Sequence, residues 1–274
     1  MKAALRHTTN SGEKLMQTRR TFLATLAGAS AFALAACGGS KDSGSSAPAA
    51  AAGDGTDAKG EGVMTYDEYV AAAVDDEVVI EAFVQGNQAW WDNTITIYAA
   101  DADGGYFIYS AKCSEEDAAK VVPGQKIKVS GYKAEWSGEI EIVEGTIEFE
   151  DGSTYIAEAT DVTDLLGTDD LINYQNQKVA FTGMELKPSK DSEGNEVVYL
   201  YNWDGSGAEG DDLYFTVSDG KADYSFAVES YLCDADSDVY KAVKELAIGD
   251  VLNLEGFLYW YEGANPHITK VTKA

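Results

Sequence analysis

Four acidic side chains near the C-terminus have the spacing of calcium ligands. Asp234, Asp236, Asp238 and Glu245 occupy positions 1, 3, 5 and 12 of a calcium-loop count. Such a loop needs glycine for its sharp turn, and Val239 stands there. Aspartates at a helix start also interact favourably with the helix dipole. We therefore interpret these residues as the beginning of a helix and predict no metal site.

Catalytic motifs are missing from the sequence. It contains no nucleotide-binding glycine loop, nucleophile elbow, HExxH or CxxC motif. Carboxylate pairs of the glycosidase kind cannot be singled out among so many acidic residues. His267, the only histidine after residue 36, follows Pro266, and we expect it at the surface or at a strand edge. These observations predict a binding protein rather than an enzyme, with no cofactor.

The five tryptophans are the candidate ligand-binding residues. They are Trp90, Trp91, Trp136, Trp203 and Trp260. An indole ring offers a flat apolar face that stacks on sugars, bases or cations. The alternative is that each ring closes the end of a domain core, and this alternative weighs most for Trp136 and Trp260. Neighbouring residues on an extended chain point to opposite sides, so Trp90 and Trp91 are not both expected to be buried.

Two segments of the chain share one pattern. Residues 124–132 and 249–257 each alternate apolar and polar side chains between two glycines, which is typical of half-buried strands. Around the first segment we predict strands at 78–86, 94–99, 106–111, 125–133 and 139–149, and a helix near 114–122. Around the second we predict strands at 178–186, 213–218, 224–230, 250–259 and 267–273, and a helix at 236–246.

The order of three strands, a helix and two strands resembles the OB-fold, a five-stranded Greek-key barrel. The resemblance implies a mainly β protein with two tandem barrels, each with one helix between strands 3 and 4. We place these domains at 63–152 and 153–274; a β-sandwich is the alternative. In OB-folds the ligand meets one face together with the loops between strands 1 and 2 (L12) and strands 4 and 5 (L45). All five tryptophans fall in these loops: Trp90, Trp91 and Trp203 in L12, and Trp136 and Trp260 in L45.

The N-terminus has the three parts of an export signal. A basic stretch ends in Arg19 and Arg20, an apolar run covers 22–36, and Cys37 follows small residues. Residues 34–37 resemble the bacterial lipobox, which implies a signal peptide over 1–36 and lipidation of Cys37. Residues 18–23 resemble the twin-arginine signal, although export by the general route stays open. The Gly-, Ser- and Ala-rich segment 37–62 is predicted to be a flexible tether.

The chain is strongly acidic. The whole chain has a net charge of −27, and after residue 36 there are 15 lysines, no arginine and 46 acidic residues, a net charge of −31. This composition disfavours nucleic acid as a partner, because nucleic-acid affinity depends largely on neutralising phosphates.

Cys113 and Cys233 hold equivalent places in the two copies, and we expect two separate thiols rather than a disulfide.

We predict an extracytoplasmic lipoprotein, anchored to the cell membrane through Cys37, that binds a ligand with tryptophan-bearing OB loops. A glycan or another ligand with flat apolar faces fits such rings. One alternative is a structural or assembly lipoprotein that docks a protein partner. Another is a protein that binds single-stranded nucleic acid.

Overall fold

The computed structural model describes residue 55 and residues 59–274. Cys37, the predicted signal peptide and most of the predicted tether lie outside the described residues. Within the described part of the chain, no helix has the length and apolar character needed to cross a membrane.

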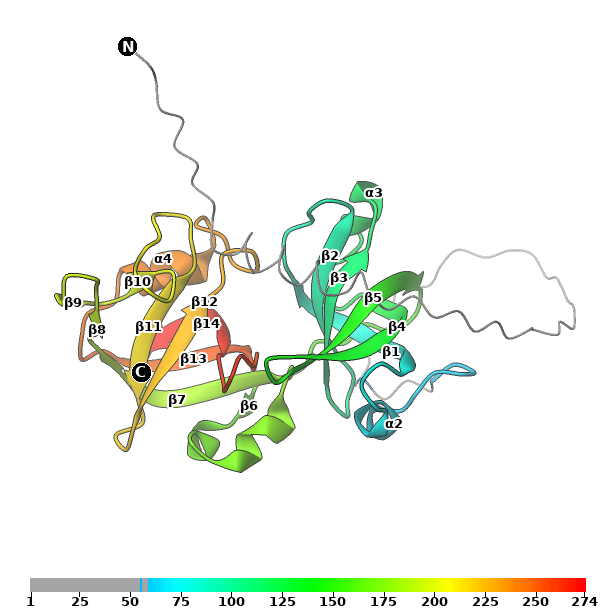
Figure 1. Cartoon of the computed structure of the whole chain (residues 1–274), viewed down its shortest axis with the longest axis horizontal. Helices are drawn as coiled ribbons and strands as arrows, with labels where there is room; N and C mark the ends of the chain where they lie inside the picture. The colour runs from blue at the N-terminus through cyan, green and yellow to red at the C-terminus, as the bar shows by residue number, and fades with distance from the viewer. Residues whose placement is uncertain (1–54, 56–58) are drawn as a thin grey trace, which may run out of the picture. The chain divides into compact units, whose positions relative to one another are not determined.

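The first barrel is closed by five strands, β1 to β5 (Figure 1). They are β1 (Glu77–Asn87), β2 (Thr94–Ala100), β3 (Gly105–Lys112), β4 (Lys126–Trp136) and β5 (Glu139–Glu150). Their spatial order is β1-β2-β3-β5-β4, and β1 pairs again with β4 to complete the ring. All neighbours are antiparallel except β3 and β5, which are parallel. The short helix α3 (Glu115–Ala118) lies between β3 and β4, and Ser114 caps it by accepting a hydrogen bond from the Asp117 amide.

The second barrel has the same strand order. It consists of β7 (Lys178–Lys187), β11 (Leu213–Ser218), β12 (Asp223–Val228), β13 (Val251–Phe257) and β14 (His267–Lys273), in the order β7-β11-β12-β14-β13. Its parallel pair is β12 with β14, and α4 (Asp238–Lys244) lies between β12 and β13. Short strands flank it: β6 (Thr160–Asp161), β10 (Leu200–Tyr201) and the hairpin of β8 (Ser189–Lys190) with β9 (Glu196–Val197).

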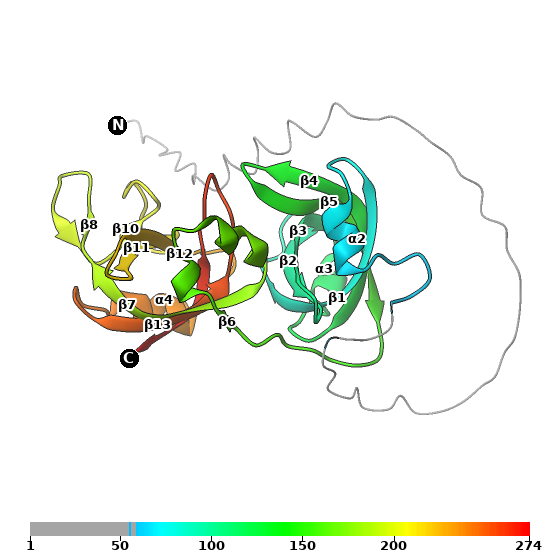
Figure 2. The ribbon, with the colours of Figure 1, turned by 90° about the horizontal axis from the view of Figure 1, so that it is seen from below.

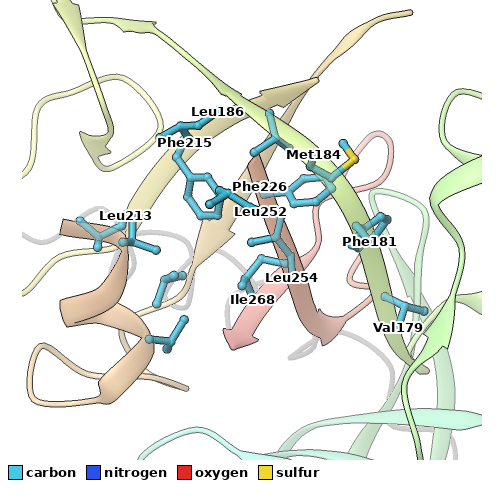
Figure 3. Packing of buried hydrophobic residues seen from close by; sticks show 14 of the residues in the cluster. Val179, Phe181, Met184, Leu186, Leu213, Phe215, Phe226, Leu252, Leu254 and Ile268 are labelled. Atoms are coloured by element: carbon cyan, nitrogen blue, oxygen red, sulfur yellow. The ribbon is translucent and has the colours of Figure 1, made fainter. Parts of the chain in front are cut away.

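Each barrel has its own apolar core, built from alternate strand residues. In the first barrel the inward positions of β4 include Ile127 and Val129, which are fully buried. Figure 3 shows the second core, where side chains from all five strands point toward one another. Ten of its members are labelled there: Val179, Phe181, Met184, Leu186, Leu213, Phe215, Phe226, Leu252, Leu254 and Ile268.

The two closed rings confirm the predicted mainly β fold with tandem OB-like barrels and exclude the β-sandwich. Three short helices were not predicted from the sequence, and neither were the two-residue strands β6, β8, β9 and β10. The helices are α2 (Tyr66–Ala71) and the 3-10 helices η2 (Thr163–Leu165) and η3 (Asp169–Tyr174). Each has six residues or fewer, which is too short for a clear apolar period.

Helix α2 lies beside the first barrel (Figure 2), and hydrogen bonds cap both of its ends. At its start, Thr65 and Glu68 form a reciprocal capping box. At its end, the buried Lys133 ammonium donates hydrogen bonds to the carbonyls of Tyr69, Val70 and Ala72 at 2.8–3.0 Å. Burial lowers the pKa of Lys133 from its ordinary value. A lysine of β4 therefore satisfies carbonyls that a helix end leaves without intrahelical partners.

We predict that Lys133→Met lowers the free energy of unfolding by about 2–4 kcal/mol, because three carbonyls lose a charged donor. The apolar stem keeps its volume, so the loss reports the hydrogen bonds. Chemical denaturation measures it, with Lys112→Met, at the exposed end of β3, as the matched control. Equal stability of the two variants would contradict this role for Lys133.

Candidate ligand-binding faces of the two barrels

The face of strands 2 and 3 in the first barrel carries aromatic side chains. Along β2 and β3, Tyr98, Phe107 and Tyr109 alternate with residues of the barrel core and form a separate buried cluster. The second barrel supplies Phe257 and Tyr259 to this cluster. The Tyr98 and Phe257 rings are stacked, with centroids 4.3 Å apart and planes within 4° of each other. The aromatic face that an OB-fold offers to ligands is therefore covered by the second barrel.

Polar contacts surround this aromatic cluster. The Tyr98 hydroxyl and Nδ1 of His267 are 3.1 Å apart, and the imidazole stacks on the Tyr259 ring at 4.5 Å. The Gln88 side chain donates to the Glu229 carboxylate at 3.1 Å, and the Ala89 amide donates to the Tyr231 carbonyl at 2.8 Å. His267 is 6% exposed, so of the two expected positions, surface or strand edge, the surface is wrong. It is the first residue of β14, and it contacts Tyr98 of the first barrel.

The L45 loops of the two barrels contact each other. The Glu139 carboxylate accepts a hydrogen bond from the Trp260 amide at 2.8 Å, and the Glu262 amide donates to the Ser137 carbonyl at 2.7 Å. A Cβ atom at Gly138 would lie 2.8 Å from Cδ1 of Trp260, so only glycine permits this approach. Trp260 is half-buried and also packs against the core of its own barrel. Its ring is thus part of the contact between the barrels.

The three tryptophans of the first barrel have different surroundings. Trp90 is half-buried against the barrel core, and its indole N–H donates to the Cys113 carbonyl at 2.9 Å. Trp91 is 58% exposed at the β1–β2 turn, which confirms that the neighbouring indoles are not both buried. Trp136 is the last residue of β4, and it is half-buried. Of these three rings, only Trp91 presents most of its surface to solvent.

The second barrel carries the most exposed indole of the described residues. Trp203 is 70% exposed and lies in L12, just after β10. The same turn contains Gly205, whose Cβ position would be 3.4 Å from the Leu200 side chain. Leu200 is paired across the sheet with Tyr214 of β11. The turn that carries Trp203 is thereby placed at the outer face of β10 and β11.

The L45 loop of the second barrel reaches the same face. Tyr214 lies near Tyr261 and forms a side-chain hydrogen bond with Asn265. Both partners belong to L45, and Tyr261 is 41% exposed. Burial raises the pKa of the Tyr214 hydroxyl, with Asp212 and Glu229 as neighbouring charges, so the hydroxyl stays protonated at neutral pH. Tyr214 of β11 and Tyr261 of L45 therefore lie close together, and the turn of Trp203 in L12 follows β10, the strand that pairs with β11. We call the outer surface of β10 and β11, together with these two loops, the second-barrel face.

Acidic groups lie beside this face, at the contact between the barrels. The Asp212 carboxylate accepts hydrogen bonds from the Ser230 amide at 2.8 Å and from its hydroxyl at 2.7 Å. Burial raises the pKa of Asp212 above its ordinary value. Burial and the charge of Asp212 raise the pKa of Glu229 to about 8. At neutral pH Glu229 therefore carries a proton for most of the time.

A shallow cleft of about 290 Å³ lies next to these acids. It is lined by Asn87 and Ala89 of the first barrel and by residues 230–234 and Ser237 of the second. Cys233 lines it as a half-buried thiol, and burial raises its pKa to about 12. Cys113 is a buried free thiol in the other barrel, also with a raised pKa. Protonated thiols of this kind are poor nucleophiles.

The carboxylates with calcium-ligand spacing belong to the start of α4. Asp234 accepts a hydrogen bond from the Asp236 amide at 3.0 Å, and Ser237 caps the helix that begins at Asp238. Among the described residues, no group of three or more histidine, cysteine, aspartate or glutamate side chains is arranged to hold a metal ion.

No protein-family model and no curated protein sequence matches this chain. Solved structures match it at low identity. The HINa domain of Ifi202 in complex with 20-bp dsDNA aligns over 73% of this chain and 100% of its own, at 11% identity and a TM-score of 0.35. A replication protein A heterotrimer bound to ssDNA aligns over 71% of this chain and 49% of its own, at 10% identity and a TM-score of 0.30. The fold assignment itself rests on the strand order of this chain.

The expectation that nucleic acid is disfavoured as a partner is corrected by these comparisons, since the matched structures include DNA-bound proteins. That expectation was based on the net charge of the whole chain, which does not describe the charge of one binding groove. Single-strand binding also depends on stacking platforms and on the local groove. Nucleic acid therefore belongs among the ligands that have to be tested.

We predict that wild-type stability falls between about pH 4.5 and pH 8 because of Glu229. An acid whose pKa is higher in the folded state stabilises the fold below its unfolded pKa and loses this contribution as the pH approaches the folded value. One such group contributes at most about 1.4 kcal/mol per pH unit. Urea denaturation across this range measures it, with Glu229→Gln lacking the slope and the exposed Glu245→Gln retaining it. A constant difference between wild type and Glu229→Gln at every pH would contradict the raised pKa.

Proposed function

We propose that this protein is a membrane-tethered, extracytoplasmic binding protein whose ligand site is the second-barrel face. The observation that carries the proposal is the 70% exposure of Trp203 beside that face. Exposing an indole ring to water is unfavourable unless a ligand or partner covers it. The corresponding face of the first barrel is already covered by Phe257 and Tyr259.

The proposed ligand is a glycan or another molecule with flat apolar faces. Sugar rings stack on indole and phenol rings through their C–H faces, and their hydroxyls need acceptors at the rim. Asp204 and Ser206 lie in the turn of Trp203, where the Ser206 amide donates to the Asp204 carboxylate at 3.0 Å. On β8 and β11, the Ser189 and Thr216 hydroxyls are hydrogen bonded to each other at 3.0 Å. This set of acceptors on a face with aromatic rings suits a polyhydroxylated ligand.

Single-stranded nucleic acid is the second candidate ligand. It is favoured by the strand order, because OB barrels bind both oligonucleotides and oligosaccharides with the same face and loops. Bases stack on aromatic rings without regard to sequence. A glycan array and a retention assay with single-stranded DNA, run in parallel on the full chain, distinguish the two candidates.

Trp203→Ala is expected to weaken ligand binding by about 1–3 kcal/mol, the range for loss of one stacking ring. The melting temperature should change little, because the ring is mostly exposed. Trp91→Ala is the matched control: it removes another exposed indole, from the first barrel, and should leave binding unchanged. Titration calorimetry with the strongest array hit decides. Equal losses in the two variants, or none in Trp203→Ala, would refute the second-barrel face as the site.

The proposed tether rests on the resemblance of residues 34–37 to the lipobox. Two acyl chains on Cys37 would hold the protein at a membrane where one would not. The last tether residues are attached to the first barrel, where the Lys59 ammonium pairs with the Asp101 carboxylate at 2.6 Å. The proposed ligand face thus belongs to the barrel that does not receive the tether.

Cys37→Ala should move the protein from the membrane fraction to the soluble fraction, because the thiol that would carry the lipid is removed. Cell fractionation followed by immunoblotting measures this distribution, and Cys113→Ala controls for the loss of a thiol elsewhere. Membranes that still retain Cys37→Ala after a high-salt wash would contradict lipid anchoring.

A further inference from the structure

The loop that carries Trp203 is held in one conformation by its own hydrogen bonds. The Gly207 amide donates to the Tyr201 carbonyl at 3.0 Å, and the Gly205 amide donates to the Asn202 carbonyl at 3.2 Å. The Asn202 amide in turn donates to the Asp212 carbonyl at 2.8 Å, which closes the base of the loop. Trp203 therefore lies in a turn that is hydrogen bonded on both sides.

Helix α4 contacts the second half of this loop through the side chain of Tyr240. The Tyr240 side chain is fully buried in the barrel core. Its hydroxyl accepts a hydrogen bond from the Gly210 amide at 3.0 Å and donates one to the Asp211 carbonyl at 2.8 Å. One phenol group thereby satisfies two backbone groups of an exposed loop.

A second contact comes from the same face of α4, one turn later. The Lys244 ammonium pairs with the Glu209 carboxylate, whose other oxygen accepts a hydrogen bond from the Tyr201 hydroxyl at 2.6 Å. Tyr240 and Lys244 are four residues apart, so both project toward the loop. Glu209 is thus bound to both the helix and the strand that leads into the loop.

We propose that Tyr240 and Lys244 are positioning residues that hold the 202–212 loop so that the Trp203 ring is presented to ligand. Neither side chain needs to touch the ligand. The effect is preorganisation: a loop that is ordered before binding loses less conformational entropy when the ligand arrives. This inference rests on the proposed function, because it assigns Trp203 a ligand.

Hydrogen exchange of the full chain without ligand tests the clamp itself. In Tyr240→Phe and in Lys244→Met, amides of residues 203–211 should exchange about tenfold faster, while β11, β12 and β13 keep their wild-type rates. Lys241→Met is the matched control, because this lysine of α4 is exposed and contacts Asp236 rather than the loop. Unchanged exchange of the loop in both test variants would overturn the proposal.

Binding of the strongest glycan-array hit tests the consequence for ligand. Tyr240→Phe should weaken affinity by about three- to tenfold, and should have no further effect in a Trp203→Ala background. A merely structural role would give the same loss in both backgrounds, and that result would overturn positioning through Trp203. If the loop loosens as expected but neither the glycans nor single-stranded DNA bind the wild type, the proposed function fails, and the positioning role fails with it. The clamp would then remain as a structural contact.

Discussion

The stacking of Tyr98 on Phe257 is the contact that covers the outer aromatic face of the first barrel. Each ring lies on the outer surface of its own barrel, and the pair is held within a cluster of six buried residues. An aromatic pair of this kind contributes about 0.5–1.5 kcal/mol beyond the burial of its surface. Gly86 in β1 makes room for it, since a Cβ there would lie 3.0 Å from the Phe257 ring. Because this contact covers the outer face of β2 and β3, the ligand site that we propose lies on the other barrel.

The two copies of the fold have the same strand order and differ in how far their outer aromatic residues are covered. In the first, the outer aromatic residues pack against protein, and L45 contacts the partner loop. In the second, L12 runs from residue 188 to 212 and carries an exposed indole on a turn fastened to α4. A longer loop in one copy is a common way for a duplicated fold to acquire a binding site, because loops tolerate insertions better than strands.

Much of the fold could be predicted from the sequence, because alternation between glycines marks strands such as 251–257 directly. The candidate site could be predicted only in part. Trp90 and Trp91 are neighbours in the sequence. Their alternation along an extended chain indicates that they are not both buried, but it does not identify which ring is exposed. Tyr98 and Phe107 alternate with core residues on strands that are apolar on both faces, and this pattern indicates a covered outer surface. The contact between the barrels involves residues up to 169 positions apart, and no local pattern reports such pairs.

Hydroxyl-radical footprinting of the full chain in solution tests the central claim most directly. The claim is that the outer aromatic face of the first barrel is covered while the second-barrel face is open. It predicts strong oxidation of Trp203 and Tyr261 and protection of Tyr98, Phe107 and Phe257. Oxidation of Tyr98 and Phe107 at rates comparable to Trp203 would contradict it, because the first barrel would then have a free ligand face.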